Sequence, residues 1–240
     1  MVRSHAFRIP LAVVAVGAIA AIVASTAAAD ISGPCTASIA GQNVQGRGTG
    51  AFGDAITVEK NAVVPVTMNA RTQISHLKIQ IEFAGMRWTV RDKPSHGPSW
   101  ANSVNVKKYS KYGVGLYKVI GSSSGGTSCS GAALVRVKGN PLSTPAGIIG
   151  LIAALLGLGG IAGTAALALH SGAMGIGKSL LGLIAGLLGG LGLAVLLQQY
   201  AVVYPSMIAA IAFVGGGAVV GVGLTLLGKI LSSGAAAAAS

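Results

Sequence analysis

The stretch GIIGLIAALLGLGGIAGTAALAL, residues Gly147–Leu169, contains no charged side chain and decides the class of this protein. Two more apolar stretches follow it, Leu180–Leu197 and Met207–Gly228. A helix needs about 20 apolar residues to cross the roughly 30 Å hydrocarbon core of a bilayer. Lipid offers a bare backbone no hydrogen-bond partner, so segments that cross it must be helical. We therefore predict three transmembrane helices, at about 147–169, 180–197 and 207–228.

The composition divides the chain into a polar and an apolar part. Hydrophobic residues make up 52% of the 240 residues and charged residues only 9%, whereas a soluble domain carries about 25% charged residues. All acidic residues precede residue 93, and after residue 140 only Lys178 and Lys229 carry a formal charge. We predict a polar domain over 30–140, a transmembrane domain over 141–231 and a low-complexity cytoplasmic tail over 232–240.

The first 29 residues have the pattern of a secretory signal peptide. Arg3 and Arg8 give it a basic start, Ile9–Ala24 is apolar, and Ala27–Ala29 offers the small residues of a cleavage site. An uncleaved signal anchor is the alternative. In either case the signal directs residues 30–140 out of the cytoplasm.

The two late lysines agree with this orientation. If 30–140 is outside, the loop containing Lys178 and the end of the last helix at Lys229 both lie in the cytoplasm, as the positive-inside rule expects. We predict a multi-pass protein of the cell membrane with a cytoplasmic C-terminus.

The polar part has the periodicity of β-strands. Residues His76–Phe83 alternate polar and apolar, which places Leu77, Ile79 and Ile81 on one half-buried face. Several other short strands follow from similar patterns, separated by turn signals such as the Pro94–Pro98 segment, which we expect to be a loop. Many short strands in about 110 residues favour an all-β sandwich.

The chain has two cysteines, Cys35 and Cys129, one near each end of the polar part. An extracytoplasmic location is oxidising, and an even cysteine count fits one disulfide. Two free thiols are the alternative. The predicted bridge closes a long loop and so stabilises the folded domain.

The segments Tyr112–Val119 and Cys129–Val137 together resemble the terminal hairpin of an immunoglobulin-like domain. The resemblance implies an immunoglobulin-like sandwich, although the tryptophan expected just after the first cysteine of such a domain is absent. The predicted fold is therefore mixed: an extracytoplasmic all-β sandwich followed by an α-helical transmembrane bundle of three glycine-rich helices.

Basic and aromatic residues gather in two segments of the polar part, within a chain whose net charge is +12. Cations attract anionic groups, and tyrosine and tryptophan suit stacking or the membrane interface. We predict a patch that binds anionic lipid headgroups or an acidic wall polymer; a solvated rim around core aromatics is the alternative. Because the domain is outside the cell, nucleic acid is not an expected partner. The patch comprises Arg87, Trp88, Arg91, Lys93, Lys107, Lys108, Tyr109, Lys111 and Tyr112.

The apolar stretches contain glycines at four-residue spacing. Glycines without side chains let helix backbones approach closely, which drives helix association in lipid. We predict helix packing through these residues, with the same chain or with other membrane proteins as partner. The positions are Gly159, Gly163, Gly182, Gly186, Gly190, Gly217 and Gly221.

Motifs for catalysis are weak. Gly172–Ser179 fits the spacing of a phosphate-binding loop, but it joins two predicted membrane helices, and no acidic residue follows residue 92 to help hold Mg²⁺. The four histidines have no metal-ligand spacing, and His96 alone could belong to an envelope-enzyme site. We expect no metal, no cofactor and no enzymatic activity.

Three functions follow in order of preference. The first is an integral membrane protein of the cell envelope that anchors an exported interaction domain and packs through its helices as an oligomer or a subunit of a complex. The second is an oligomeric channel or an accessory subunit of a transporter. The third is an envelope enzyme. The uncharged helices argue against a pump, because ion-coupled transport needs ionisable groups in the membrane.

Overall fold

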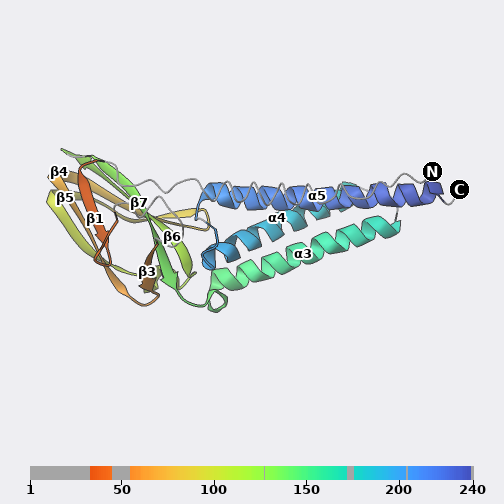
Figure 1. Cartoon of the computed structure of the whole chain (residues 1–240), viewed down its shortest axis with the longest axis horizontal. Coiled ribbons are helices and arrows are strands. Elements are labelled where there is room, and N and C mark those ends of the chain that lie inside the picture. The colour runs from red at the N-terminus through yellow and green to blue at the C-terminus, as the bar shows by residue number, and fades with distance from the viewer. Residues whose placement is uncertain (1–32, 45–54, 127, 172–175, 204, 239–240) are drawn as a thin grey trace, which may run out of the picture. The chain divides into compact units, whose positions relative to one another are not determined.

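The computed structural model describes residues 33–44, 55–126, 128–171, 176–203 and 205–238 (Figure 1). The predicted signal peptide lies outside these residues. The described chain divides into two compact units. The first, here the β unit, runs to Ile149 and also includes Val195–Ala210. The second, here the helical unit, comprises Gly150–Ala194 and the residues from Ile211 onward.

Seven strands form one hydrogen-bonded sheet in the β unit. The sheet order is β2-β1-β4-β6-β7-β3, and β5 pairs with β4. Neighbouring strands are antiparallel except β3 and β7, which are parallel. The strands are β1 (Cys35–Ile39), β2 (Gln42–Asn43), β3 (Ile56–Glu59), β4 (Val63–Phe83), β5 (Met86–Asn105), β6 (Gly115–Gly125) and β7 (Cys129–Lys138), and one helical turn, α2 (Lys107–Ser110), follows β5.

Strands β4 and β5 are much longer than the sequence predicts. Strand β4 extends the predicted strand His76–Phe83 back to Val63, and β5 continues through Pro94–Pro98, where we expected a loop. Within the described chain β5 pairs only with β4, so it is an edge strand. Proline is tolerated on an edge because its missing N–H faces away from the ladder. The loop prediction is wrong for this reason.

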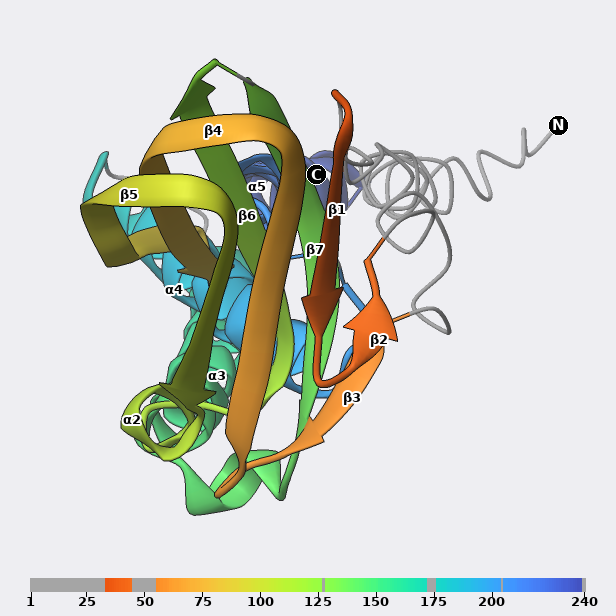
Figure 2. The same cartoon turned by 90° about the vertical axis from the view of Figure 1, so that its left-hand side faces the viewer.

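The sheet curves until it is nearly closed, like a barrel (Figure 2). Along β4, the partner strand is first β1 and then β6, with a register shift near Ile74. The predicted disulfide between Cys35 and Cys129 is confirmed: it joins β1 to β7 with a Cα–Cα distance of 6.1 Å. Aliphatic side chains, among them the fully buried Ile56, fill the interior.

The structure confirms a mostly-β domain but does not confirm the immunoglobulin-like sandwich. A sandwich has two separate sheets packed face to face. Here the described strands belong to one continuous sheet, because the long β4 carries its pairing from β1 across to β6. Strand pairing of this kind depends on residues far apart in the sequence, which local alternation does not specify.

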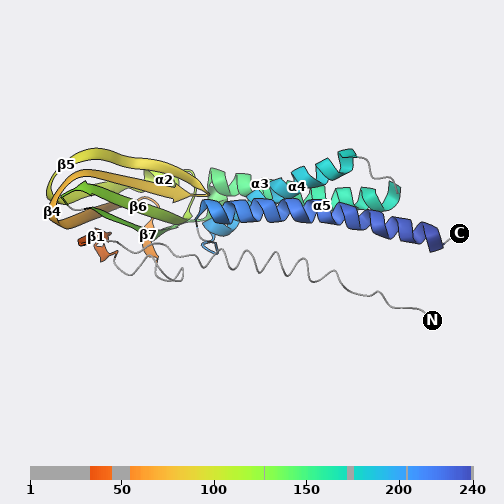
Figure 3. The ribbon, with the colours of Figure 1, turned by 90° about the horizontal axis from the view of Figure 1, so that it is seen from above.

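Three long helices follow the strands: α3 (Pro145–Ser171), α4 (Ile176–Gln199) and α5 (Met207–Ala238). They lie side by side (Figure 3). All three are long and apolar enough to cross a membrane, as predicted. The helix α5 continues to Ala238 through the segment that the sequence assigned to a tail. Alanine has the highest helix propensity, and this segment is rich in it.

Candidate functional site

The register of β4 and β5 places two cations opposite buried core residues, Arg91 being half-buried and Lys93 exposed. Arg91 lies opposite Ile79, and Lys93 lies opposite Leu77. Residues directly opposite each other in an antiparallel pair share one face. Ile79 and Leu77 are buried core residues, 6% and 1% exposed. Arg91 and Lys93 therefore occupy positions where the alternation of a core strand would put apolar side chains.

The second half of β5 turns back toward the first half. In a straight strand, residues 91 and 100 would lie roughly 30 Å apart, at about 3.3 Å per residue. The guanidinium carbon of Arg91 is instead 5.2 Å from the centre of the Trp100 ring, a cation–π contact. Between them lies Gly97, whose φ of +146° is a conformation that side chains disfavour. The bend brings both halves of β5 to the same space, as the curved ribbon in Figure 2 shows.

This space is a groove of about 370 Å³, here called the β5 groove. Its volume lies in the range of about 300–1,000 Å³ typical of small-molecule sites. The lining combines cations, aromatic rings and neutral polar groups above a few aliphatic side chains. The groove is lined by Ile79, Thr89, Val90, Arg91, Asp92, Lys93, Trp100, Asn102, Ser103, Val104, Asn105, Lys108 and Tyr109.

Arg91, which lines this groove, has an unsatisfied donor in its side chain. Its Nε atom is buried and has no hydrogen-bond partner. A buried N–H without a partner costs about 1–3 kcal/mol, so such groups in native structures call for an explanation. The planar fork of a guanidinium matches a carboxylate or a phosphate, which would satisfy this N–H.

The one carboxylate on the groove wall is engaged elsewhere. Asp92 lies opposite Lys78 in the ladder. Its carboxylate is 3.7 Å from the Lys78 ammonium and 2.9 Å from Nε2 of His76. The one acid of the lining therefore already has partners, and the three cations Arg91, Lys93 and Lys108 outnumber it, so the groove favours anions. Burial also raises the pKa of the Tyr109 phenol, which is neutral at physiological pH even at its ordinary value of about 10.

The structure brings together only part of the predicted anionic-ligand patch. Arg91, Lys93, Lys108 and Tyr109 line the β5 groove, whereas the other five residues do not. Arg87 forms an ion pair with Glu82 at 3.1 Å, and the Lys111 ammonium lies 4.7 Å from the Tyr112 ring centre. Trp88 is 39% exposed, and Lys107 is exposed.

Trp100, Asn102 and Asn105 also line the groove and were not among the predicted patch residues. They follow the segment that we expected to be a loop; Asn105 fell in a predicted strand, residues 103–108, but the sequence does not give the partner of that strand. Residues 100–105 have no regular alternation of polar and apolar side chains, so the sequence carries no signal that places them in a groove.

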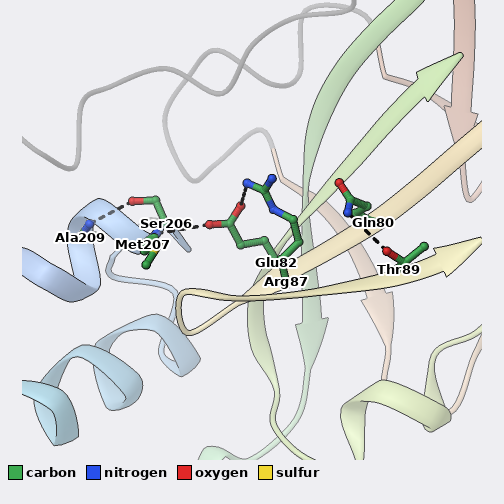
Figure 4. Close-up of polar contacts among 7 residues, drawn as sticks. All are labelled: Gln80, Glu82, Arg87, Thr89, Ser206, Met207 and Ala209. Atoms are coloured by element: carbon green, nitrogen blue, oxygen red, sulfur yellow. Dashed lines mark hydrogen bonds and ion pairs between the residues drawn. The ribbon is translucent and has the colours of Figure 1, made fainter. Parts of the chain in front are cut away.

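A second polar cluster lies where the β4–β5 hairpin contacts the loop between α4 and α5, within the β unit (Figure 4). The Glu82 side chain is 5% exposed, and its Oε2 accepts a hydrogen bond from Arg87 at 3.1 Å. Its Oε1 accepts one from the backbone N–H of Met207 at 3.3 Å, and Ser206 Oγ accepts one from Ala209 N–H at 3.1 Å. Together they satisfy N–H groups at the start of α5 that lack a partner within the helix.

Two glutamines hold the end of α4 in the same way. The side-chain oxygen of Gln198 accepts from Ala84 N–H at 2.8 Å, and its Nε2 donates to the Leu116 carbonyl at 3.1 Å. The Gln199 side-chain oxygen accepts from the Thr144 hydroxyl at 2.8 Å. Both glutamines are 4% exposed. Buried polar contacts of this kind fix the helix end in one position against the strands.

The predicted packing glycines fall into two groups. Gly182, Gly186 and Gly190 of α4 face α5: a Cβ added to Gly186 would meet the Gly217 carbonyl, and one added to Gly221 would meet that of Gly182. Gly159 and Gly163 of α3 have nothing within 4 Å of an added Cβ.

Helix α3 approaches α4 through other glycines. An added Cβ on Gly157 would meet the backbone of Gly189, and one on Gly192 would meet that of Ala154. Helix α4 therefore packs between α3 and α5 by backbone contacts on two of its sides.

The remaining motifs gather no recognisable site in the described residues. No three histidine, cysteine or carboxylate groups there could hold a metal ion. His96 is exposed on β5. The match to a phosphate-binding loop lies partly outside the described residues, and its Gly177, Lys178 and Ser179 belong to α4.

No protein-family model and no curated protein matches the chain. Among solved structures, the crystal structure of an LPMO from Kitasatospora papulosa aligns with 36% of this chain, at 8% identity and a TM-score of 0.29. The alignment spans 52% of that protein's length. A likeness at this TM-score carries no argument about function.

Proposed function

We propose that the chain is an integral membrane protein of the cell envelope that crosses the bilayer with α3, α4 and α5 and holds its β unit outside the cytoplasm to bind an anionic ligand. The single observation that carries the binding role is Arg91, a half-buried cation opposite Ile79 with a buried, unsatisfied Nε. The proposal is one of binding rather than catalysis.

The membrane role is supported by the surfaces of the helices. Large apolar side chains point away from the protein on each of them: Leu156 of α3 is 65% exposed, Leu181 of α4 is 54% exposed, and Val219 of α5 is 66% exposed. Helices that are apolar on all sides suit lipid rather than water. The glycine contacts described above support a tight bundle within one chain. The oligomer or complex that the sequence suggests stays a prediction.

Sidedness is tested with introduced cysteines, because both native cysteines are in the disulfide. Lys60 is exposed on the β unit, and Lys178 lies near the start of α4. A membrane-impermeant maleimide should label Lys60→Cys in intact cells and Lys178→Cys only after lysis. Labelling of Lys178→Cys alone in intact cells would reverse the proposed topology.

Anion binding is tested with the full chain in nanodiscs of neutral lipid. The probes are a short polyphosphate and an oligogalacturonate, and the readout is calorimetry. A hydrogen bond to a charged group contributes about 1.5–3 kcal/mol, so Arg91→Gln should weaken binding by roughly 10–100-fold. Affinity should also fall with added salt.

Arg71→Gln is the matched control, because Arg71 is an exposed arginine of β4 that does not line the groove. It should leave affinity within about twofold of the native chain, a charge at the surface being largely screened. The binding role is wrong if neither probe binds, or if both arginine variants lose affinity equally.

A further inference from the structure

We infer that the ligand of the β5 groove is an acidic saccharide, a sugar unit that carries a carboxylate or a phosphate. This inference rests on the anion-binding function proposed above. Arg91, Lys93 and Lys108 would bind the acidic group, while the neutral and aromatic residues beside them would contact the sugar. The neutral residues of the lining are the reason to infer a saccharide and not a simple inorganic anion.

The neutral polar groups of the groove present donors. Oδ1 of Asn102 accepts from Ser103 N–H at 2.8 Å, and Oδ1 of Asn105 accepts from Lys107 N–H at 3.1 Å. A backbone N–H can only donate, so in both amides the oxygen faces the backbone and the NH₂ group is directed elsewhere. Such a lining suits a ligand with many oxygen acceptors, such as the hydroxyl, ring and acid oxygens of an acidic sugar.

Thr89 adds a hydroxyl to this wall. Its Oγ1 accepts a hydrogen bond from Gln80 Nε2 at 3.4 Å, which leaves the hydroxyl hydrogen to donate (Figure 4). The contact is exposed, so the hydroxyl is within reach of solvent or ligand.

Two aromatic rings line the same groove, Trp100 and Tyr109. An aromatic side chain combines a large apolar face with a polar edge or tip. A sugar ring has the complementary form, with C–H groups on its faces and hydroxyls around its rim. The volume of about 370 Å³ also exceeds what a single inorganic anion would fill.

The apolar space beneath the groove is too small for a lipid chain. Two cavities share groove residues such as Ile79, and each has a volume of about 60 Å³. A cavity of about 150 Å³ holds one benzene-sized molecule. These cavities therefore do not accommodate an acyl chain, which favours a saccharide over an anionic lipid held by its chain.

The test uses Trp100 as the reporter. The chain has two tryptophans, so Trp88→Phe leaves Trp100 as the single one. This full-length variant, in nanodiscs of neutral lipid, is titrated with an oligogalacturonate, a neutral malto-oligosaccharide of equal length, a short polyphosphate, and vesicles containing an anionic lipid. We expect the oligogalacturonate to shift Trp100 emission and to bind at least tenfold more tightly than each other probe.

Two variants separate recognition of the sugar from recognition of charge. Asn102→Ala and Thr89→Val each remove a neutral donor and leave the three cations in place. Each should weaken oligogalacturonate binding about fivefold or more and change polyphosphate binding less than twofold. Asn61→Ala, at an exposed turn outside the groove, should change neither. Native-like thermal unfolding shows that a variant is folded, and Thr89→Val keeps a β-branched side chain in case Asn102→Ala unfolds.

The outcomes are distinct. If polyphosphate or the anionic vesicles bind as tightly as the oligogalacturonate, the saccharide inference is overturned while anion binding stands. If the oligogalacturonate keeps its preference but both donor variants bind it normally, the groove is not its site and the inference is again overturned. If none of the anionic probes binds, the proposed binding function fails as well.

Discussion

Replacing both cysteines should strongly destabilise the β unit. The bridge joins residues with a sequence separation of 94, and the chain-entropy relation for a loop of this length gives about 4–5 kcal/mol at 25 °C. Strand β1 adds to this dependence, because β4 and the two-residue β2 are its ladder partners in the described sheet. Cys35 and Cys129 are 1% and 2% exposed, so Cys35→Ala/Cys129→Ala removes the bridge without leaving buried thiols.

The unfolding of the β unit can be followed by itself in the full chain. Both tryptophans, Trp88 and Trp100, lie on β5, so tryptophan emission in nanodiscs reports on the strands and not on the helices. With a urea m-value of about 1–3 kcal/mol/M, the loss corresponds to a fall in the unfolding midpoint of roughly 1.3–5 M. Reduction of the native chain under the same conditions should reproduce the variant.

Two outcomes would contradict a stabilising role of the disulfide. If the double variant loses less than about 1 kcal/mol, the bridge does not constrain the unfolded chain as assumed. If the reductant also destabilises the cysteine-free variant, the effect of reduction is unrelated to the disulfide.

Three other substitutions test the packing and the polar contacts. Gly186→Ala forces a side chain against the α5 backbone and should lower the free energy of unfolding in detergent by about 1–3 kcal/mol. Gly159→Ala is the control, because its added methyl group meets nothing within 4 Å. An equal loss of stability in both variants would contradict the described packing. Glu82→Gln keeps an acceptor for the first turn of α5 but loses the ion pair with the half-exposed Arg87. We expect the free energy of unfolding in urea to fall by about 1 kcal/mol. An unchanged free energy of unfolding, both in 1 M salt and without it, would count against the pair. Burial raises the pKa of Tyr117, so this residue's contribution to the stability of the β unit should be constant below pH 10 and fall above it, where only the unfolded phenol ionises. Tyr117→Phe removes the hydrogen bond that the hydroxyl donates to the Gly113 carbonyl at 2.6 Å, so it should lower stability by about 1 kcal/mol at pH 7 and flatten the alkaline decline. An unchanged decline would show that other groups cause it.

The features that were predicted correctly depend on the composition of one segment, or on there being a single possible pairing of two cysteines. The three apolar helices were predictable because a segment's suitability for lipid depends on its own length and charge content. The disulfide was predictable because the chain has two cysteines and both lie in the part expected outside the cytoplasm. Neither inference required knowledge of which distant segments meet.

The groove could not be predicted in this way. Four of the nine patch residues meet in it because β5 bends near Gly97 and brings Trp100 back to Arg91. The sequence marked Pro94–Pro98 as a loop, since proline disrupts a ladder in the middle of a sheet. That rule does not apply to an edge strand, and whether a strand lies at an edge depends on the pairing of the whole sheet.

The amino-acid sequence by itself thus determines which segments suit lipid and which suit water, because the free energy of transfer between the two depends on the side chains of each segment alone. The single curved sheet, the position of Arg91 opposite Ile79 and the glycines that contact one another arise from the folded arrangement. They depend on strand register and helix rotation, which are settled by contacts between residues far apart in the chain.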